Sequence, residues 1–163
     1  MKHVRKAILA LGSNMGNRRQ NLIEAVAAIQ DFCDVVFRSK IYQTPPVGFS
    51  DQRDFLNAAL AVRTECEPVE LLRLCKILEE KMGRKHSFRN APRPIDVDII
   101  FFEGYESDSE ELTVPHPRWR ERDFVKTPLI DLMKCGAFEG EFFDDVRDIL
   151  ENSPKMFPPF SAF

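Results

Sequence analysis

The pattern of apolar and polar positions along this chain predicts four strands and two long helices in its first hundred residues. In two segments, apolar residues recur three and four positions apart, as on one face of a helix. Shorter runs rich in β-branched and aromatic residues, typical of strands, surround these segments. The predicted strands are 7–11, 35–42, 55–62 and 93–102, and the predicted helices are 18–32 and 68–82. This β-α-β-β-α-β order is that of a ferredoxin-like α+β sandwich, in which helices pack on an antiparallel sheet.

Turn and capping residues mark the borders of these elements. Asn17 is placed as the N-cap of the first helix, Pro68 suits the first turn of the second, and Gly83 ends it. Pro45 and Pro46 stop the second strand, and we expect that strand to pair antiparallel with the third.

The last third of the chain is less regular. Apolar spacing predicts a third helix over 124–133 and a weaker fourth over 139–151. The proline-containing tail 154–163 is expected to be extended and to lie outside the catalytic unit. We therefore expect one domain over residues 1–150 and a C-terminal tail of unassigned role over 151–163.

Composition and charge exclude several classes of protein. The formal net charge of −3 provides no general field to attract nucleic-acid phosphates, so a nonspecific nucleic-acid binder is not expected. The four cysteines lack C-x-x-C spacing, which argues against both a zinc site and a disulfide framework. The basic N-terminus precedes too short an apolar run for a signal peptide, and no run is long enough for a membrane span. A cytoplasmic protein is expected.

Two aspartates within an otherwise apolar strand are the strongest chemical signal. Asp96 and Asp98 stand two positions apart, so their side chains share one face of the strand, roughly 7 Å apart. Two carboxylates on a hydrophobic element repel each other and are costly to desolvate, which favours a bound cation. Oxygen ligands of this kind suit Mg²⁺ that also holds substrate phosphates. The alternative is a strand end that dips into solvent.

Basic residues occur on both sides of this strand. Arg84 and Arg93 belong to a basic loop that leads directly into it, and arginine can give paired hydrogen bonds to phosphate oxygens. Gly83 offers a hinge on which this loop could close over a substrate. After the strand, His116 is held between two prolines and Arg122 follows it, which suits phosphate binding. The alternatives are a solvated loop and a structural histidine.

Phe55 and Asn57 stand two positions apart on another predicted strand. They would offer a stacking surface beside a hydrogen-bonding amide, which suits a flat heterocycle, although core packing is the alternative. The glycine-containing segment 12–16 lacks the lysine of a phosphate-binding loop, and we interpret it as a structural turn between strand and helix.

Taken in order, these motifs resemble the 6-hydroxymethyl-7,8-dihydropterin pyrophosphokinase family of folate biosynthesis. The resemblance extends from about residue 7 to residue 132. The matching segments are 11–14, 42–48, 55–58, 79 with 83–84, 91–98 and 112–116.

The resemblance implies a reaction and a set of residues for it. A pyrophosphoryl group would pass from ATP to the hydroxymethyl oxygen of the pterin, releasing AMP, with two Mg²⁺ ions bound by Asp96 and Asp98. Arg84 and Arg93 correspond to the catalytic arginines that reach the phosphates. Asp98 is the nearest candidate for a general base, and the alternative is that metal coordination and positioning suffice without one. Further contacts with ATP are implied for Glu79, Ile99, Leu112, Thr113, His116 and Arg122.

For the pterin, the family pattern implies a sandwich between two aromatic plates, Phe55 and Phe124. Asn57 would read the amide edge of the ring. Thr44, Pro45 and Val47 would line the pocket. The family commonly has tyrosine in place of Phe55, a change that keeps the stacking face.

The chain departs from well-known members at three further positions, Asn90, Glu111 and Pro117. These departures concern loop closure and nucleotide affinity rather than the reaction. Trp119, the only tryptophan, is a candidate for the lid over the site.

Two other functions compete with this one. A metal-dependent phosphohydrolase would use water in place of the pterin, and a ferredoxin-like RNA-binding module would stack bases on its aromatic residues. The acidic net charge and the aspartate pair argue against the second. We expect ATP and a pterin as small-molecule partners, no nucleic acid, no membrane, and a monomer.

Overall fold

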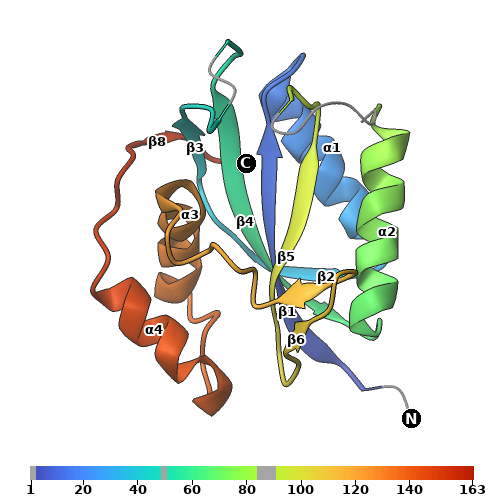
Figure 1. Ribbon diagram of the computed structural model, residues 1–163, viewed down its shortest axis with the longest axis vertical. Helices are drawn as coiled ribbons and strands as arrows, with labels where there is room; N and C mark the ends of the chain where they lie inside the picture. Colours follow the sequence, from blue (N-terminus) through green and yellow to red (C-terminus); the bar gives the residue numbers. More distant parts are fainter. Residues whose placement is uncertain (1–2, 49–50, 84–90) are drawn as a thin grey trace.

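A computed structural model of the chain describes residues 3–48, 51–83 and 91–163, which form an antiparallel sheet with helices on both faces (Figure 1). The strands of the main sheet are β1 (Arg5–Ser13), β2 (Asp34–Arg38), β3 (Ile41–Thr44), β4 (Phe55–Thr64), β5 (Asp96–Phe102) and β8 (Pro159–Ser161). They lie in the order β5-β1-β4-β3-β8, and β2 also pairs with β4. The ferredoxin-like α+β prediction is confirmed.

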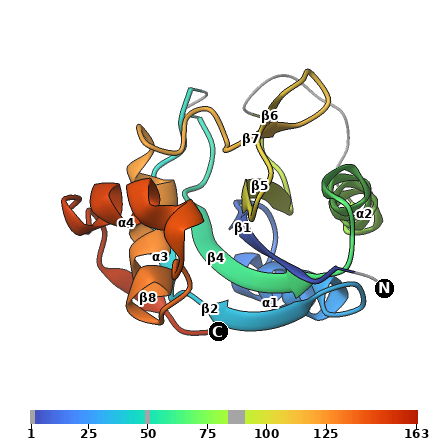
Figure 2. The same cartoon turned by 90° about the horizontal axis from the view of Figure 1, so that it is seen from below.

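Among the described residues, four helices cover the two faces of the sheet in pairs (Figures 1 and 2). The helices are α1 (Arg18–Ile29), α2 (Pro68–Lys81), α3 (Asp123–Lys134) and α4 (Asp144–Glu151). Residues of α1 and α2 share one apolar core with the sheet, and residues of α3 and α4 share a second core with its opposite face. None of the described helices has both the length and the apolar composition needed to cross a membrane. The remaining elements are the strands β6 (Ser107–Asp108) and β7 (Thr113–Val114) and the 3-10 turn Glu141–Phe143.

Local sequence signals mark where α1 and α2 begin. The Asn17 side chain accepts a hydrogen bond from the Gln20 backbone N–H at 3.1 Å, which caps α1 as predicted. Pro68 occupies the first turn of α2, where a backbone N–H makes no hydrogen bond within the helix, so proline, which lacks this N–H, costs nothing there.

One predicted strand is in fact two. The run 35–42 is interrupted at Ser39, so β2 and β3 pair separately with β4. Both bonds of the ladder at this point involve Ser39 and Ala59. The Ser39 backbone N–H donates to the Ala59 carbonyl at 2.9 Å, and the Ser39 hydroxyl accepts from the Ala59 N–H at 2.8 Å. A side chain that takes the place of a backbone carbonyl breaks the regular strand.

A bulge in β5 changes which side chains face which core. Ile8 of β1 pairs with Phe101, but Leu9 pairs with Ile99, so Ile100 is an extra residue. Ile100 and Phe101 therefore both pack on the α3 side of the sheet. The Ile100 carbonyl accepts a hydrogen bond from the His116 backbone N–H at 2.9 Å, which holds the segment after β7 against β5.

The C-terminal tail is extended, as expected, but it also joins the sheet. Its strand β8 pairs antiparallel with β3, with Ile41 opposite Ser161 and Tyr42 opposite Pro159. The tail passes outside α3 to reach this edge (Figure 1).

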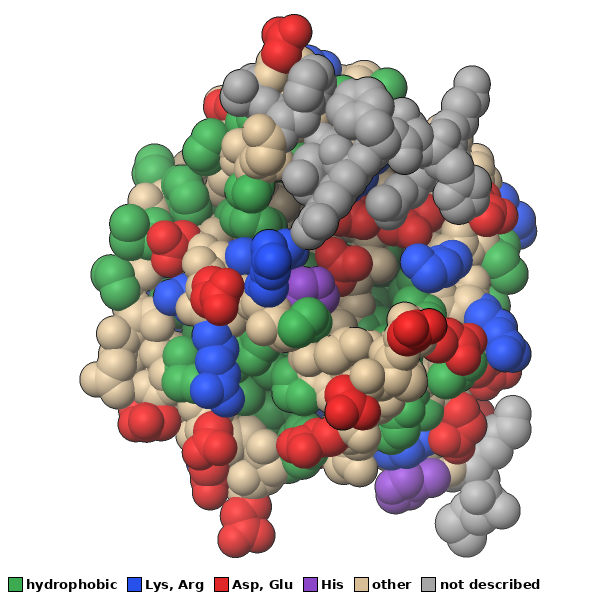
Figure 3. All heavy atoms as spheres, in the orientation of Figure 1, with side chains coloured by type: hydrophobic (Ala, Val, Ile, Leu, Met, Phe, Trp, Pro, Cys, Tyr) green, Lys and Arg blue, Asp and Glu red, His purple; other side chains and the backbone are tan. Residues whose placement is uncertain are grey.

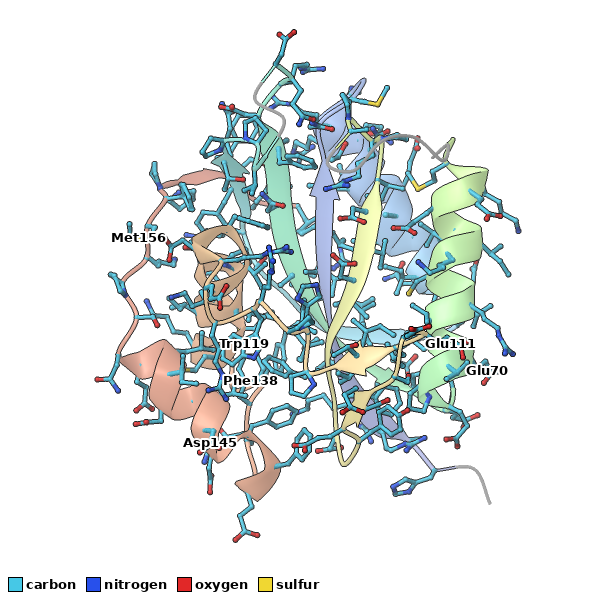
Figure 4. All side chains as sticks on the ribbon, in the orientation of Figure 1. Glu70, Glu111, Trp119, Phe138, Asp145 and Met156 are labelled. Atoms are coloured by element: carbon cyan, nitrogen blue, oxygen red, sulfur yellow. The ribbon has the colours of Figure 1, made fainter. Side chains whose placement is uncertain are left out.

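Trp119 belongs to the core between the sheet and α4. It is 3% exposed and packs edge-on against Phe101 with ring centroids 5.0 Å apart, and Phe138 packs on the same ring at 5.9 Å (Figure 4). The expectation that Trp119 belongs to a lid is therefore wrong, because its indole is committed to aromatic packing.

Candidate active site

A pocket lies at the end of the sheet where β1 and β3 finish and β4 and β5 begin. Its empty volume, open mouth included, is about 790 Å³. Basic, acidic and histidine side chains gather near the middle of one face of the molecule, next to apolar ones (Figure 3). The predicted site residues that line the pocket are Thr44, Pro45, Val47, Phe55, Asn57, Arg93, Asp96, Asp98, His116, Arg122 and Phe124.

The sheet register explains why residues so far apart in sequence meet here. Gly12 of β1 is paired with Asn57 on one side and with Asp96 on the other. Ala10 is likewise paired with Asp98. Because neighbouring strands are about 4.8 Å apart, Asn57 and Asp96 are separated by roughly 10 Å across β1. The amide and the carboxylates thus stand on opposite sides of a floor of small residues.

Gly12 is a site residue that the sequence interpretation missed. It lies within β1 rather than in the following turn, and it lines the pocket. A Cβ atom at this position would be 3.0 Å from Asn57 Oδ1 and 3.4 Å from a ring carbon of Phe55. The order of elements along the chain could not reveal this role, because it depends on the pairing that places Gly12 between Asn57 and Asp96.

Asp96 and Asp98 project from the same face of β5 into the pocket, as the two-residue spacing predicted. Both are half-buried. Val97, between them, is buried in the core on the opposite face. Arg93 Nε lies 3.6 Å from Asp96 Oδ2, and the Arg93 guanidinium carbon is 5.3 Å from the centre of the Phe55 ring.

Asn14 is a second residue that the sequence interpretation missed. It is 2% exposed, and its Oδ1 accepts a hydrogen bond from the Arg93 backbone N–H at 2.8 Å. Its Nδ2 donates to Gln52 Oε1 at 2.6 Å and to the Arg53 carbonyl at 3.3 Å. Asn14 therefore fastens the segment entering β5 to the segment entering β4, one on each side of the pocket.

The carboxylates fit a Mg²⁺ ion that shares its ligands with a substrate. Within residues 3–48, 51–83 and 91–163, no cluster of three or more His, Cys, Asp or Glu side chains could hold a metal. Mg²⁺ is commonly held by one or two carboxylates, with phosphate oxygens and water completing its octahedral shell. Asp96 and Asp98 can supply this protein share.

His116 is held as a neutral hydrogen-bond donor beside the carboxylates. Its Nδ1 accepts a hydrogen bond from the Arg118 backbone N–H at 3.3 Å, so the proton of the neutral ring is on Nε2. Burial lowers the pKa of His116 from its ordinary value of 6.5, and the nearby positive charge of Arg122 lowers it further.

The opposite half of the pocket is aromatic and amide-rich. The Asn57 Nδ2 donates to Thr44 Oγ1 at 2.5 Å, which fixes the orientation of the buried amide. Phe124 comes from the first turn of α3, where the guanidinium carbon of Arg122 is 5.6 Å from its ring centre. Phe55 and Phe124 both line the pocket, from β4 and α3 respectively.

Four residues predicted to contact ATP do not line this pocket. Glu79, 4% exposed on α2, accepts a hydrogen bond from the Val97 backbone N–H at 2.9 Å. Ile99 and Leu112 belong to the core shared with α1 and α2, and the Thr113 hydroxyl donates to the Ser109 carbonyl at 3.1 Å.

Of the other positions singled out in the sequence, Arg84 and Asn90 are outside the residues that the structure describes. Glu111 lies beside α2, 3.9 Å from Arg73, where both side chains are exposed (Figure 4).

Comparison with known proteins gives a consistent result. Residues 8–134 match the family described as 7,8-dihydro-6-hydroxymethylpterin-pyrophosphokinase (HPPK). The chain is 43% identical over 137 residues to the 2-amino-4-hydroxy-6-hydroxymethyldihydropteridine pyrophosphokinase of Bacillus subtilis, covering 83% of this chain and 81% of that protein. It is also 43% identical over 130 residues to a folate synthesis bifunctional protein of Arabidopsis thaliana, covering 78% of this chain but 27% of the plant protein. The chain thus spans about a quarter of the length of this plant relative.

Solved structures show the same fold. A crystal structure of HPPK-DHPS in complex with substrates superposes with a TM-score of 0.66 at 15% identity, covering 90% of this chain and 42% of that one. The Plasmodium falciparum HPPK-DHPS A437G structure with SDX-DHP gives a TM-score of 0.67 at 14% identity, covering 93% and 46%.

Proposed function

The chain belongs to the 7,8-dihydro-6-hydroxymethylpterin-pyrophosphokinase family, and from this premise we propose that it transfers pyrophosphate from ATP to 6-hydroxymethyl-7,8-dihydropterin in folate biosynthesis, releasing AMP. The observation that carries the proposal is the row Asn57–Gly12–Asp96 across three strands. This row supports the proposal because Phe55 and Asn57, the candidate surface for a flat ring, line the same pocket as the two carboxylates, roughly 10 Å away across β1.

In this proposal the pterin lies between Phe55 and Phe124. Stacking between flat rings supplies much of the affinity, and a buried amide distinguishes the edge of the ring. Thr44 holds Asn57 in position for that role through their hydrogen bond. Pro45 and Val47 line the pocket next to Thr44.

Asp96 and Asp98 bind Mg²⁺ in this proposal, two ions in all. Bound there, the ions would neutralise the phosphates of ATP and the charge that develops during transfer. Arg93 already lies next to Asp96, and His116 presents an N–H, so both can hold phosphate oxygens. Arg122 is placed to reach the same anion, and Arg84 is proposed as a further catalytic ligand of it.

The bond changes follow from the products. The hydroxymethyl oxygen attacks the β-phosphorus of ATP, and the bond from that phosphorus to the oxygen of the α-phosphate breaks, releasing AMP. The proton of the hydroxyl group must leave as the new bond forms. Asp98 is the candidate to accept it, because it faces the pocket from β5.

The contacts with ATP proposed for Glu79, Ile99, Leu112 and Thr113 stay predictions. We propose that the protein acts as a monomer on ATP and the pterin alone, and sedimentation velocity at assay concentration tests the first point.

Product analysis tests the reaction. Protein mixed with ATP, Mg²⁺ and 6-hydroxymethyl-7,8-dihydropterin should form AMP and the pterin diphosphate, and removal of Mg²⁺ with EDTA should stop turnover.

Asp96→Ala and Asp98→Ala should each lower kcat by about 10³-fold or more, because the ions are lost with their ligands. Asp34→Ala is the matched control, an exposed aspartate of β2 on another part of the sheet.

Three results would contradict the proposal. Release of ADP would indicate an ordinary kinase, and loss of ATP without pterin would indicate a phosphohydrolase. Full activity of either pocket variant would remove the metal role from that aspartate.

A further inference from the structure

The C-terminal tail attaches to β3, next to the half of the pocket proposed to bind the pterin. This pterin half is formed by Thr44, Phe55, Asn57 and Phe124, with Pro45 and Val47 beside them. The family match ends at residue 134, so α4 and the tail lie beyond it. After α4, the chain runs along the outside of α3, where Met156 is half-exposed, and then pairs with β3 through β8 (Figure 4). A segment outside the family region thus forms the edge of the sheet next to the site.

Lys155 of the tail completes a partly buried polar group between α3 and β3. Its Nζ lies 2.6 Å from Asp131 Oδ1. Asp131 Oδ2 accepts hydrogen bonds from the Tyr42 hydroxyl at 2.6 Å and from the Lys40 backbone N–H at 3.0 Å. The Asp131 side chain is 13% exposed and Tyr42 is fully buried, so the Lys155 cation offsets part of the cost of desolvating the Asp131 carboxylate.

The two elements joined by this group carry the walls of the pterin half. Tyr42 is paired in register with Asn57, and it precedes Thr44 by two positions on β3. Asp131 belongs to α3, whose first turn carries Phe124. One row across the sheet therefore runs from the tail through β3, β4 and β1 to β5: Pro159, Tyr42, Asn57, Gly12 and Asp96.

A second set of contacts ties the end of the tail to α1. Arg19 donates to Ser161 Oγ at 3.3 Å and to the Ala162 carbonyl at 3.0 Å. The Arg18 guanidinium lies 6.0 Å from the centre of the Phe160 ring and also donates to the Asp54 carbonyl at 3.0 Å. Asp54 directly precedes Phe55, so this contact also ends beside the pterin half.

We propose that the tail is a positioning element for the pterin: Lys155, by holding Asp131 against Tyr42, sets the spacing between Asn57 on the sheet and Phe124 on α3. The inference rests on the proposed function. It concerns the pterin rather than ATP, because Asp96, Asp98 and His116 lie at the opposite edge of the sheet, on and beside β5.

Full-length point variants test this role. Lys155→Ala should raise the KM for the pterin about five- to tenfold, with kcat and the KM for ATP within about twofold of wild type. Lys155→Arg, which keeps the cation, should restore most of the pterin KM. Lys76→Ala is the matched control, because it removes the same charge from an exposed position of α2 on the other face of the sheet.

A change in the KM for the pterin without a change in kcat or in the KM for ATP distinguishes a positioning role from a simple loss of folded protein. A destabilised variant has fewer active molecules, so its kcat falls while the KM of each substrate is unchanged. A double variant, Lys155→Ala with Asp131→Asn, should have a pterin KM no higher than the higher of the two values measured for Lys155→Ala and Asp131→Asn alone. The effects do not add, because both changes break the same contact.

The outcomes also separate this inference from the function on which it rests. Wild-type protein that forms no AMP overturns the proposed function, and the inference falls with it. Active wild-type protein together with an unchanged pterin KM in Lys155→Ala overturns the inference alone. Equal increases of the KM for the pterin and for ATP would also overturn it.

Discussion

Gly12 and Ala10 form the part of β1 that lies between Asn57 and the two aspartates, and both line the pocket. Neither brings more than a methyl group into it. A larger side chain on this strand would fill the space between Asn57 and the carboxylates, so the proposed function requires these residues to be small as well as Asp96 and Asp98 to be charged.

Gly12→Ala tests the floor of the pocket at the level of one methyl group. The new Cβ would be 3.0 Å from Asn57 Oδ1, so the amide must shift by a few tenths of an ångström. We expect the KM for the pterin to rise about tenfold, or about 1.4 kcal/mol of binding, with a smaller change for ATP. Steady-state kinetics with each substrate varied in turn measures both.

Folding is the control for this variant. Gly12 lies in regular β1 and its φ angle is not in the left-handed region, so alanine brings no backbone strain. Its thermal unfolding should stay close to that of wild type, and a pterin KM equal to that of wild type would show that the floor has room to spare.

At the scale of elements, β5 is the strand that presents the carboxylates, and its position depends on contacts made behind it. Val97 and Ile99 anchor it in the core shared with α1 and α2. Glu79 of α2 accepts the Val97 N–H between the two aspartates. The bulge at Ile100 then leaves a carbonyl that fastens His116.

Glu79→Ala tests this support. The change removes an acceptor for a buried backbone N–H, so the free energy of unfolding should fall by about 1–3 kcal/mol. Glu79→Gln keeps an oxygen acceptor of the same shape and should lose less. Urea unfolding of both variants measures the difference.

Kinetics on the same variants decides between two roles for Glu79. If it supports β5, Glu79→Gln should keep the KM for ATP of wild type. An ATP KM raised tenfold in that stable variant would instead support the contact with nucleotide predicted from the family pattern.

At the scale of the whole molecule, the tail, α3 and β3 are joined through one ionic group. Burial and the hydrogen bond to Asp131 raise the pKa of Tyr42 to about 12. The pKa of Asp131 is lowered, because its hydrogen bonds to Lys155, Tyr42 and the Lys40 N–H outweigh the effect of burial. The group thus keeps its charges and its protonated tyrosine through the neutral range.

Alkaline unfolding tests this group. In the unfolded chain Tyr42 titrates near its ordinary pKa of 10, whereas in the native protein it holds its proton to about 12. The unfolded state therefore binds fewer protons between these values, and stability falls as pH rises. The free energy of unfolding of wild type should fall more steeply than that of Tyr42→Phe above pH 10.

Urea unfolding at pH 8, 9.5, 10.5 and 11 measures the two slopes. At pH 8 wild type should be more stable by about 0.5–1.5 kcal/mol, the usual net value of one hydrogen bond, and this advantage should shrink as the pH rises. Parallel curves for the two proteins would show that the Tyr42 hydroxyl has no special partner in the folded state.

Strand and helix types followed from the sequence where side-chain periodicity was strong. The break at Ser39 did not, because a serine hydroxyl that replaces a backbone partner leaves no mark in apolar spacing. Trp119 is a lid candidate from the sequence alone, and only its packing against Phe101 shows that it is a core residue.

By itself, the sequence determined the paired carboxylates, the aromatic and amide pair, and the order of elements, because each depends on residue spacing along one segment. The tertiary structure decided the register of the strands, which brings Asn57, Gly12 and Asp96 together in one row. It also decided the space that Gly12 leaves open. It also decided that the tail closes the sheet beside the pocket. Pairing between distant strands is set by the sum of many core contacts, so no single segment can reveal it.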